Sequence, residues 1–105
     1  MLTPKDYCDY DTCVALEELG YPRYHYDNGG ELDKILRMVT LYNAQKWLRK
    51  YKQMVLYPTY LAKADMWICE ICYRKKGLGF GDYHQSYEEA LSEGIKEAVK
   101  ILKEE

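Results

Sequence analysis

The chain has 105 residues, of which 48% are hydrophobic and 30% charged. This composition is typical of one globular domain, residues 1–105, and excludes a disordered or membrane-spanning chain. Residues 1–11 are polar and acidic and lack the hydrophobic stretch of a signal peptide. Four cysteines without a secretory signal indicate free thiols in a reducing compartment, so we expect a cytoplasmic protein.

The net charge of −2 hides a segregation of charge along the chain. Residues 1–45 carry four basic and eight acidic residues, residues 46–76 carry eight and two, and residues 77–105 carry three and seven. We favour solvated faces that neutralise one another across the fold over a patch that binds nucleic acid or an acidic partner. Twelve tyrosines against one phenylalanine fit either a shallow core or a contact surface for a partner.

A short amphipathic helix is predicted from about residue 11 to Leu19. Asp9 and the residues after it supply N-cap candidates, and Gly20 with Pro22 ends the helix. Cys8 and Cys13 are five residues apart, a spacing that matches no common pair of metal ligands on a helix.

The next segment contains the turn dipeptide Asn28-Gly29, so residues 24–32 are predicted to form a hairpin or an exposed loop. His25 stands between two tyrosines, and we interpret it as an ordinary strand residue rather than a ligand or a catalytic group. Residues 35–39 fit either a strand or a helical turn.

A second helix is predicted over Leu41 to Tyr51, with Thr40 as its N-cap. Its predicted buried stripe consists of Leu41, Ala44, Leu48 and Tyr51, with Trp47 beside it. Its other face is basic and carries Lys46, Arg49, Lys50 and Lys52. With the adjacent Tyr51, this face is the best candidate for contact with nucleic acid.

Two strands are predicted after this helix. Gln53 to Tyr57 forms the first, and Pro58 limits it to a sheet edge or an early end, so this edge is a candidate for homodimerisation. Met66 to Arg74 forms the second and central strand, antiparallel to the first. Its odd-numbered side chains are apolar and are expected to face the core.

The central strand contains the motif Cys69-x-x-Cys72, which in other settings holds zinc or forms a redox pair. Residues three apart on a strand point to opposite faces of the sheet, so we interpret both as ordinary buried or half-buried thiols.

A glycine-rich segment, residues 77–82, follows the central strand. It lacks the spacing of a phosphate-binding loop and ends in Asp82, so a flexible turn or irregular β segment is favoured. His84 lies near Asp82, but no nucleophile is recognisable beside this pair. Ser86 and Glu89 then form a predicted capping box that opens the longest helix, residues 87–103, which is expected to cover one face of the sheet.

Two segments resemble a known group of proteins. Ala44-Gln45-Lys46-Trp47-Leu48-Arg49 and Ser86-Tyr87-Glu88-Glu89-Ala90-Leu91 are similar to segments in small proteins of gut Bacteroidales and of their phages or mobile elements. The resemblance covers roughly residues 11–103. That family has no assigned activity, so the resemblance implies a host or phage accessory protein and transfers no catalytic residue.

The order of strand, glycine-rich turn and capped helix also looks like the end of a double-stranded-RNA-binding domain, or of an antitoxin with a partial ribonuclease-H-like fold. In the RNA-binding family lysines at the start of the last helix grip phosphates. Glu88 and Glu89 stand at those positions here, which argues against binding of double-stranded RNA. The antitoxin similarity concerns the fold alone.

The sequence therefore predicts an α+β domain in which about three helices pack on a small antiparallel sheet. We expect a non-enzymatic interaction protein without cofactor or metal, whose partner is a protein rather than nucleic acid. The alternative is nucleic-acid binding by the basic segment 46–76. An enzyme would require Cys69, Cys72, Asp82 and His84 to converge. The candidate contact residues for either partner are Lys46, Arg49, Lys50, Lys52, Lys75, Lys76, Tyr51 and Tyr57.

Overall fold

The computed structural model describes residues 3–22 and 38–105. Within these residues a three-stranded antiparallel sheet and three α-helices form a small α+β fold, which confirms the predicted fold class. The predicted hairpin or loop of residues 24–32, with His25, and most of the segment 35–39 lie outside the described residues.

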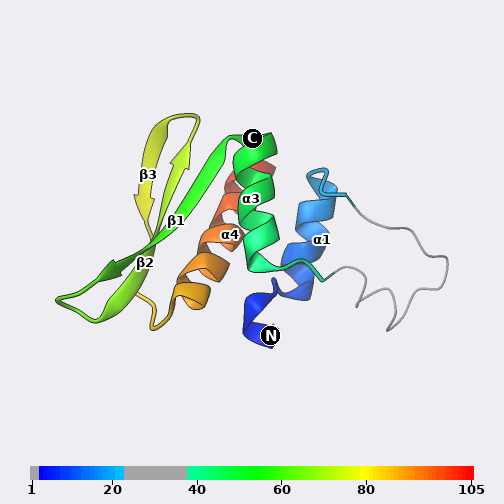
Figure 1. The fold of residues 1–105 in the computed structure, drawn as a ribbon. Helices are drawn as coiled ribbons and strands as arrows, with labels where there is room; N and C mark the ends of the chain where they lie inside the picture. The colour runs from blue at the N-terminus through cyan, green and yellow to red at the C-terminus, as the bar shows by residue number, and fades with distance from the viewer. Residues whose placement is uncertain (1–2, 23–37) are drawn as a thin grey trace.

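The elements follow one another in a simple order along the chain (Figure 1). They are the 3-10 helix η1 (Pro4–Asp6), α1 (Tyr10–Glu18), α3 (Leu41–Lys52), β1 (Met54–Leu61), β2 (Met66–Tyr73), β3 (Lys76–Phe80) and α4 (Tyr87–Lys103).

The helices all lie on one side of the sheet, whose strand order is β1-β2-β3. Helix α4 packs on β1 and β2, α3 packs on β1, and α1 packs against α4 on the side away from the sheet. The core fills the space between these layers and includes Leu16, Leu48, Leu56, Leu91 and Ile95, which are almost fully buried. The opposite face of the sheet carries no helix of the described chain.

The side-chain alternation of β2 matches the prediction. Trp67, Cys69, Ile71 and Tyr73 lie opposite the helix-facing residues of β1, and Cys69 and Ile71 are buried in the core. Because Cys72 belongs to the other set of alternating residues, it faces away from Cys69 across the sheet. The interpretation of Cys69 and Cys72 as two separate thiols agrees with this arrangement.

Strand β1 is longer than predicted, because it runs through Pro58 instead of ending there. Pro58 is tolerated because β1 is an edge strand, where a missing N–H removes no bond within the sheet. The Nε2 group of Gln45 on α3 donates a hydrogen bond of 2.7 Å to the carbonyl of Leu56. A polar side chain and a proline thus occupy this edge, which disfavours strand pairing with a second copy.

Helix starts agree well with the predicted caps. Thr40 accepts a hydrogen bond from the N–H of Asn43, and Ser86 accepts one from the N–H of Glu89. The second half of the predicted capping box differs, because the Glu89 carboxylate accepts from the N–H of Gln85 rather than from that of Ser86.

The predicted burial of Tyr51 is wrong. This side chain is 61% exposed, whereas Trp47 is buried. The helix ends at Lys52 and Gln53 turns the chain in a left-handed conformation (φ 56°), so the last turn extends past the core. The Tyr51 ring lies tilted beside that of Trp47, with their centroids 6.1 Å apart.

Helix α4 approaches β2 most closely at Gly94. A methyl group at this position would lie 2.4 Å from Sγ and 3.1 Å from Cβ of Cys69. Gly94 is buried in the middle of a 17-residue helix, where glycine costs about 1 kcal/mol relative to alanine. The close helix-to-strand contact therefore requires glycine at this site.

We expect Gly94→Ala to lower the free energy of unfolding by about 1–3 kcal/mol, because the added methyl group overpacks the contact. Adding Cys69→Ala should recover most of this loss, since it removes the sulfur. Gly77→Ala, at a site with no atom within 4 Å of the added Cβ, is the matched control. Urea unfolding measures all four proteins, and a Gly94→Ala variant as stable as the parent would contradict the account.

Candidate functional site

The face of the sheet away from the helices, here called the open face, is mostly apolar. Register and alternation place eight side chains of β1 and β2 on it, and they are Val55, Tyr57, Thr59, Leu61, Met66, Ile68, Glu70 and Cys72. Thr59 and Glu70 are the polar ones. An antiparallel sheet with one solvated face normally alternates apolar and polar residues, so this composition is unusual for a face that only meets water.

Tyr57 stands out on the open face, with 45% of its side chain exposed, while Ile68 is buried by its neighbours at the floor of the face. Tyr57 lies opposite Glu70 in the register, and the charge and hydrogen bond of this carboxylate raise the pKa of Tyr57. An exposed tyrosine with an apolar ring and a polar tip is a residue type enriched at protein interfaces.

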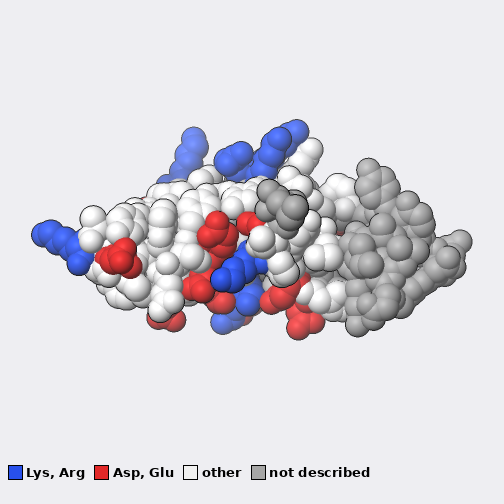
Figure 2. All heavy atoms as spheres, turned by 60° about the horizontal axis from the view of Figure 1, so that its bottom comes forward, with Lys and Arg blue, Asp and Glu red and all other residues white. Residues whose placement is uncertain are grey.

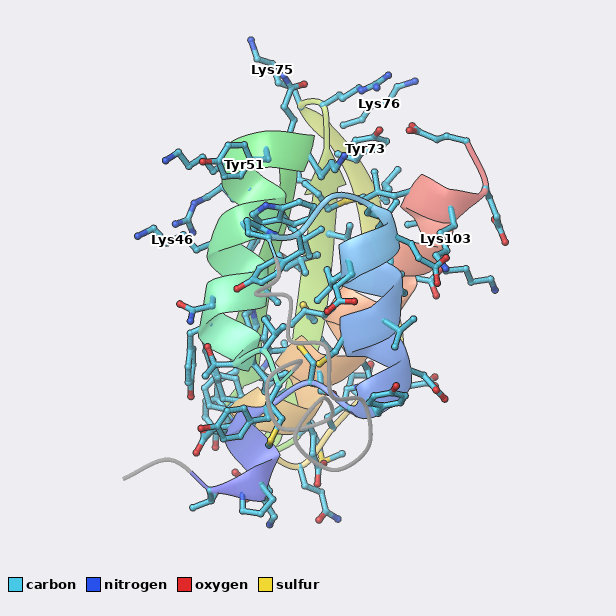
Figure 3. The ribbon with its side chains drawn as sticks, turned by 90° about the vertical axis from the view of Figure 1, so that its right-hand side faces the viewer. Lys46, Tyr51, Tyr73, Lys75, Lys76 and Lys103 are labelled. Atoms are coloured by element: carbon cyan, nitrogen blue, oxygen red, sulfur yellow. The ribbon has the colours of Figure 1, made fainter. Side chains whose placement is uncertain are left out.

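A second feature gathers cations from two separate elements at one end of the molecule. We call it the basic end, and it consists of Lys46, Arg49, Lys50, Lys52, Arg74, Lys75 and Lys76. The elements meet because the N–H of Arg74, in the turn after β2, donates to the carbonyl of Gln53, directly after α3. Figure 3 shows Lys75 and Lys76 projecting at the same end as Tyr51, with Lys46 further along α3.

No cation of the basic end forms an ion pair within the described residues, although Glu105 lines the same surface pocket as Lys52 and Arg74. The ion pairs of the described chain join Lys96 to Asp9 and Glu93, and Lys103 to Glu18. None involves a cation of the basic end, whose nearest aromatic contacts are Lys50 over Tyr51, Lys52 over Trp47 and Arg74 over Tyr73. Figure 2 shows Lys and Arg side chains projecting from the upper edge, while the viewed face carries acids with cations among them.

The structure therefore joins most of the predicted contact residues and separates one. Lys46, Arg49, Lys50, Tyr51 and Lys52 lie along α3 from its middle to its end, while Lys75 lies in the adjoining turn and Lys76 begins β3. Tyr57 belongs instead to the open face of the sheet. The predicted set is thus divided between two surfaces.

The turn between β2 and β3 is backbone-strained. Arg74 and Lys75 have φ angles of 50° and 68°, the left-handed region. They connect Tyr73 and Lys76, which pair with each other, so this is a two-residue hairpin turn. Such turns favour Asn-Gly, and a left-handed residue with a side chain costs about 1–2 kcal/mol. Two cations are therefore held at the tip of the hairpin at the expense of stability, a pattern typical of functional positions.

A cavity of about 350 Å³ lies between α4 and the β3 side of the sheet. Cys69, Asp82 and His84 line it, so three of the four residues that an enzyme would require do share one space. Burial and the charge of Glu70 raise the pKa of Cys69 to about 11, which keeps it a thiol at neutral pH and a weak nucleophile. Cys72 does not line this cavity.

Further observations bear on ligands and membranes. Within the described residues no group of three or more His, Cys, Asp or Glu side chains has a geometry that could hold a metal ion. Among the helices of residues 3–22 and 38–105, none combines the length and the apolar character that crossing a bilayer requires.

The start of α4 is acidic in the structure as in the sequence, since Glu88 and Glu89 lie in its first turn. The hydroxyl of Tyr42 lies 3.5 Å from the carboxylates of both Glu88 and Asp6, so a further acid lies close to this helix start. A phosphate backbone would meet negative charge here, which argues against the double-stranded-RNA mode of binding.

Comparisons of the chain with protein-family models, with curated proteins and with solved structures found no match.

Sequence reasoning missed the open face and the strained turn. The glycine-rich segment was expected to be a flexible turn or an irregular β segment, and the second alternative agrees with β3, Lys76–Phe80, whose pairing is irregular near Ile71 and Cys72. The two-residue spacing between paired residues Tyr73 and Lys76 would have predicted a tight hairpin, had the segment been recognised as a strand.

We predict that replacing Arg74-Lys75 by Asn-Gly raises the free energy of unfolding by about 1–2 kcal/mol, because these residues adopt the left-handed turn with less strain. Urea unfolding measures the gain. Replacing Lys63-Ala64, in the turn between β1 and β2, by Asn-Gly is the control, since neither residue has a positive φ angle. An unchanged or lowered stability of the Arg74-Lys75 variant would show that the turn is not strained.

Proposed function

We propose that this protein is a non-enzymatic accessory protein of the cytoplasm that binds another protein through its open face. The observation that carries the proposal is an apolar sheet face, without a covering helix in the described chain, that ends at the cationic turn of Arg74 and Lys75. The resemblance of two segments to small proteins of gut Bacteroidales and their phages or mobile elements supports an accessory role in such an element.

Charge and shape define the partner. The open face offers apolar side chains and one exposed tyrosine. At its end, Arg74 and Lys75 of the turn and Lys76 at the start of β3 form no ion pair within the described residues. The complementary surface is an amphipathic segment with an apolar side and acidic residues at one end.

The four free cysteines support a reducing compartment, and the protonated state of Cys69 supports a role other than nucleophilic catalysis.

Photo-crosslinking tests this proposal. A benzoylphenylalanine placed at position 57 should capture a distinct protein in the cells that produce the chain. The same group at position 42 is the control, because Tyr42 is 40% exposed but lies on the helix layer. With the captured partner purified, Tyr57→Ser should weaken binding at least tenfold, about 1.4 kcal/mol, while Tyr42→Ser leaves it unchanged.

Three outcomes would contradict the proposal. Equal capture at positions 57 and 42 would mean that the open face is not the contact surface. Capture of a second copy of the chain alone would mean that the open face is a homodimer interface. Such a dimer would differ from strand pairing at the β1 edge, which Gln45 and Pro58 disfavour. No capture at position 57 would mean that the face meets only solvent.

Nucleic-acid binding is the second candidate function, and the basic end favours it. Cations from two elements, which form no ion pair within the described residues, lie at the same end of the molecule as Tyr51. Such a mixture of cations and an exposed aromatic ring is typical of single-strand binding. Against it, the C-terminal carbonyls of α3 carry partial negative charge, and lysines at a helix C-terminus also offset that dipole without any ligand.

If the basic end binds nucleic acid, Lys50→Glu with Lys75→Glu should weaken the binding of labelled single-stranded RNA or DNA at least tenfold and lower the salt slope by about 2. Lys5→Glu with Lys63→Glu changes the net charge equally at distant, exposed sites. Fluorescence polarisation at two salt concentrations measures both variants. Equal weakening by the two would mean that binding depends only on net charge, and unchanged affinity of the first would exclude the basic end.

A further inference from the structure

The start of α1 carries two cysteines in a defined structural relationship. Asp9 is the N-cap of the helix, and its carboxylate accepts a hydrogen bond of 2.8 Å from the N–H of Thr12. Cys8 therefore precedes the N-cap, and Cys13 is the fourth helical residue. Apolar side chains at these two positions often pack together and fix the direction in which the chain enters the helix. Here the packing pair consists of two thiols.

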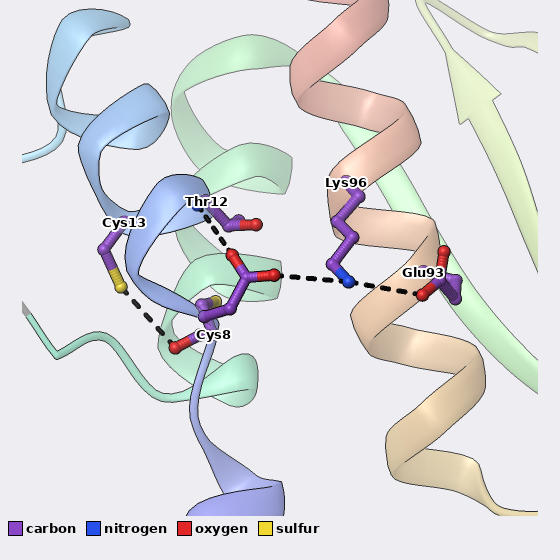
Figure 4. A network of polar contacts seen from close by, with 6 residues as sticks. Cys8, Thr12, Cys13, Glu93 and Lys96 are labelled. Atoms are coloured by element: carbon purple, nitrogen blue, oxygen red, sulfur yellow. Dashed lines mark hydrogen bonds and ion pairs between the residues drawn. The ribbon is translucent and has the colours of Figure 1, made fainter.

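The geometry holds the Cys13 thiol beside Cys8. Sγ of Cys13 donates a hydrogen bond of 3.7 Å to the carbonyl oxygen of Cys8 (Figure 4), and both side chains belong to the same buried core cluster. A hydrogen bond of 2.8 Å from the N–H of Cys8 to the carbonyl of Val39 fixes this part of the backbone. The spacing of five residues, which suggested no pairing in the sequence, is thus the spacing at which this helix start brings two side chains together.

The two thiols differ in access. Both are buried, with exposed fractions of 6% for Cys8 and 1% for Cys13, but Cys8 lines a surface cavity of about 540 Å³ together with Lys5, Met38 and Lys96. A small reagent that enters this cavity meets Cys8 first. The neighbouring Cys8 lowers the pKa of Cys13, whereas the neighbouring Cys13, together with burial, raises that of Cys8.

We propose that Cys8 and Cys13 form a reversible disulfide by exchange with a low-molecular-weight disulfide. In the first step the thiolate of Cys8 attacks one sulfur of the reagent, whose S–S bond breaks and releases one thiol. In the second step the thiolate of Cys13 attacks the Cys8 sulfur of the mixed disulfide and releases the second thiol. The protein loses two electrons and two protons, and the reagent is reduced to two thiols.

The bond would join the residue before the N-cap to the first turn of α1. Asp9, which lies between the two cysteines, also pairs with Lys96 of α4 at 3.2 Å (Figure 4). Oxidation would therefore fix the backbone on both sides of Asp9, the residue whose ion pair with Lys96 joins α1 to α4. The first step is slow at neutral pH because little of Cys8 is ionised, and its rate should rise with pH.

The chain supplies its own control, because Cys69 and Cys72 form a second pair that is closer in sequence but lies on opposite faces of β2. Trypsin cleavage after Lys5, Arg23, Lys63 and Arg74 places each pair in one peptide, residues 6–23 and residues 64–74. The reduced full-length protein is incubated with oxidised glutathione, its remaining thiols are alkylated, and both peptides are weighed by mass spectrometry.

We expect peptide 6–23 to lose about 2 Da, the mass of two hydrogens, and peptide 64–74 to carry two alkylated thiols. In urea this selectivity should disappear, because the fold no longer separates Cys69 from Cys72. The Cys13→Ser variant should stop at the mixed disulfide and retain one glutathione on Cys8.

Two results would overturn the proposal. Oxidation of peptide 64–74 in preference to peptide 6–23 would mean that the folded structure does not bring Cys8 and Cys13 together. Unmodified thiols in peptide 6–23 after incubation at raised pH would mean that the reagent does not reach Cys8.

Discussion

The close contact between Gly94 of α4 and Cys69 of β2 is the constraint on which the rest of the structure depends. A residue with a side chain at position 94 would push the helix away from the strand. Because α4 lies close to the sheet, it covers β1 and β2 and supports α1 on its other side. This single-sided packing places all described helices on one face and leaves the other face for Tyr57 and its apolar neighbours.

The arrangement of helices also explains the distribution of charge. Helices α1, α3 and α4 run in the same direction, so their N-terminal ends lie at one end of the molecule and their C-terminal ends at the other. Acids such as Asp9 and Glu89 stand at the first end, and the lysines of α3 stand at the second. The helix dipoles favour this placement. They do not account for Arg74 and Lys75, which sit in a turn and at a cost in backbone strain.

Local patterns predicted the elements well and the surfaces poorly. The alternation in β2 separated Cys69 from Cys72, and Thr40 and Ser86 marked the starts of α3 and α4, because these signals depend on neighbouring residues alone. Burial of Tyr51 depends on where α3 ends relative to the core. The helical spacing of apolar residues gives no information about that position. The contact between Cys8 and Cys13 follows from the N-cap at Asp9, and a search for packing across that cap would have found it.

The open face could not be predicted from the sequence, because it is defined by which side of the sheet the helices cover. An apolar residue such as Val55 or Leu61 has the same pattern whether a helix covers it or not, and only the positions of α3 and α4 show which face stays open.

The central claim is that this face binds a protein partner. Hydroxyl-radical footprinting of the parent chain, alone and in a non-covalent complex with the partner that cross-linking identifies, tests it most directly. The account predicts protection of Tyr57 and Met66 with Tyr42 unchanged, and protection of Tyr42 without any at Tyr57 would contradict it.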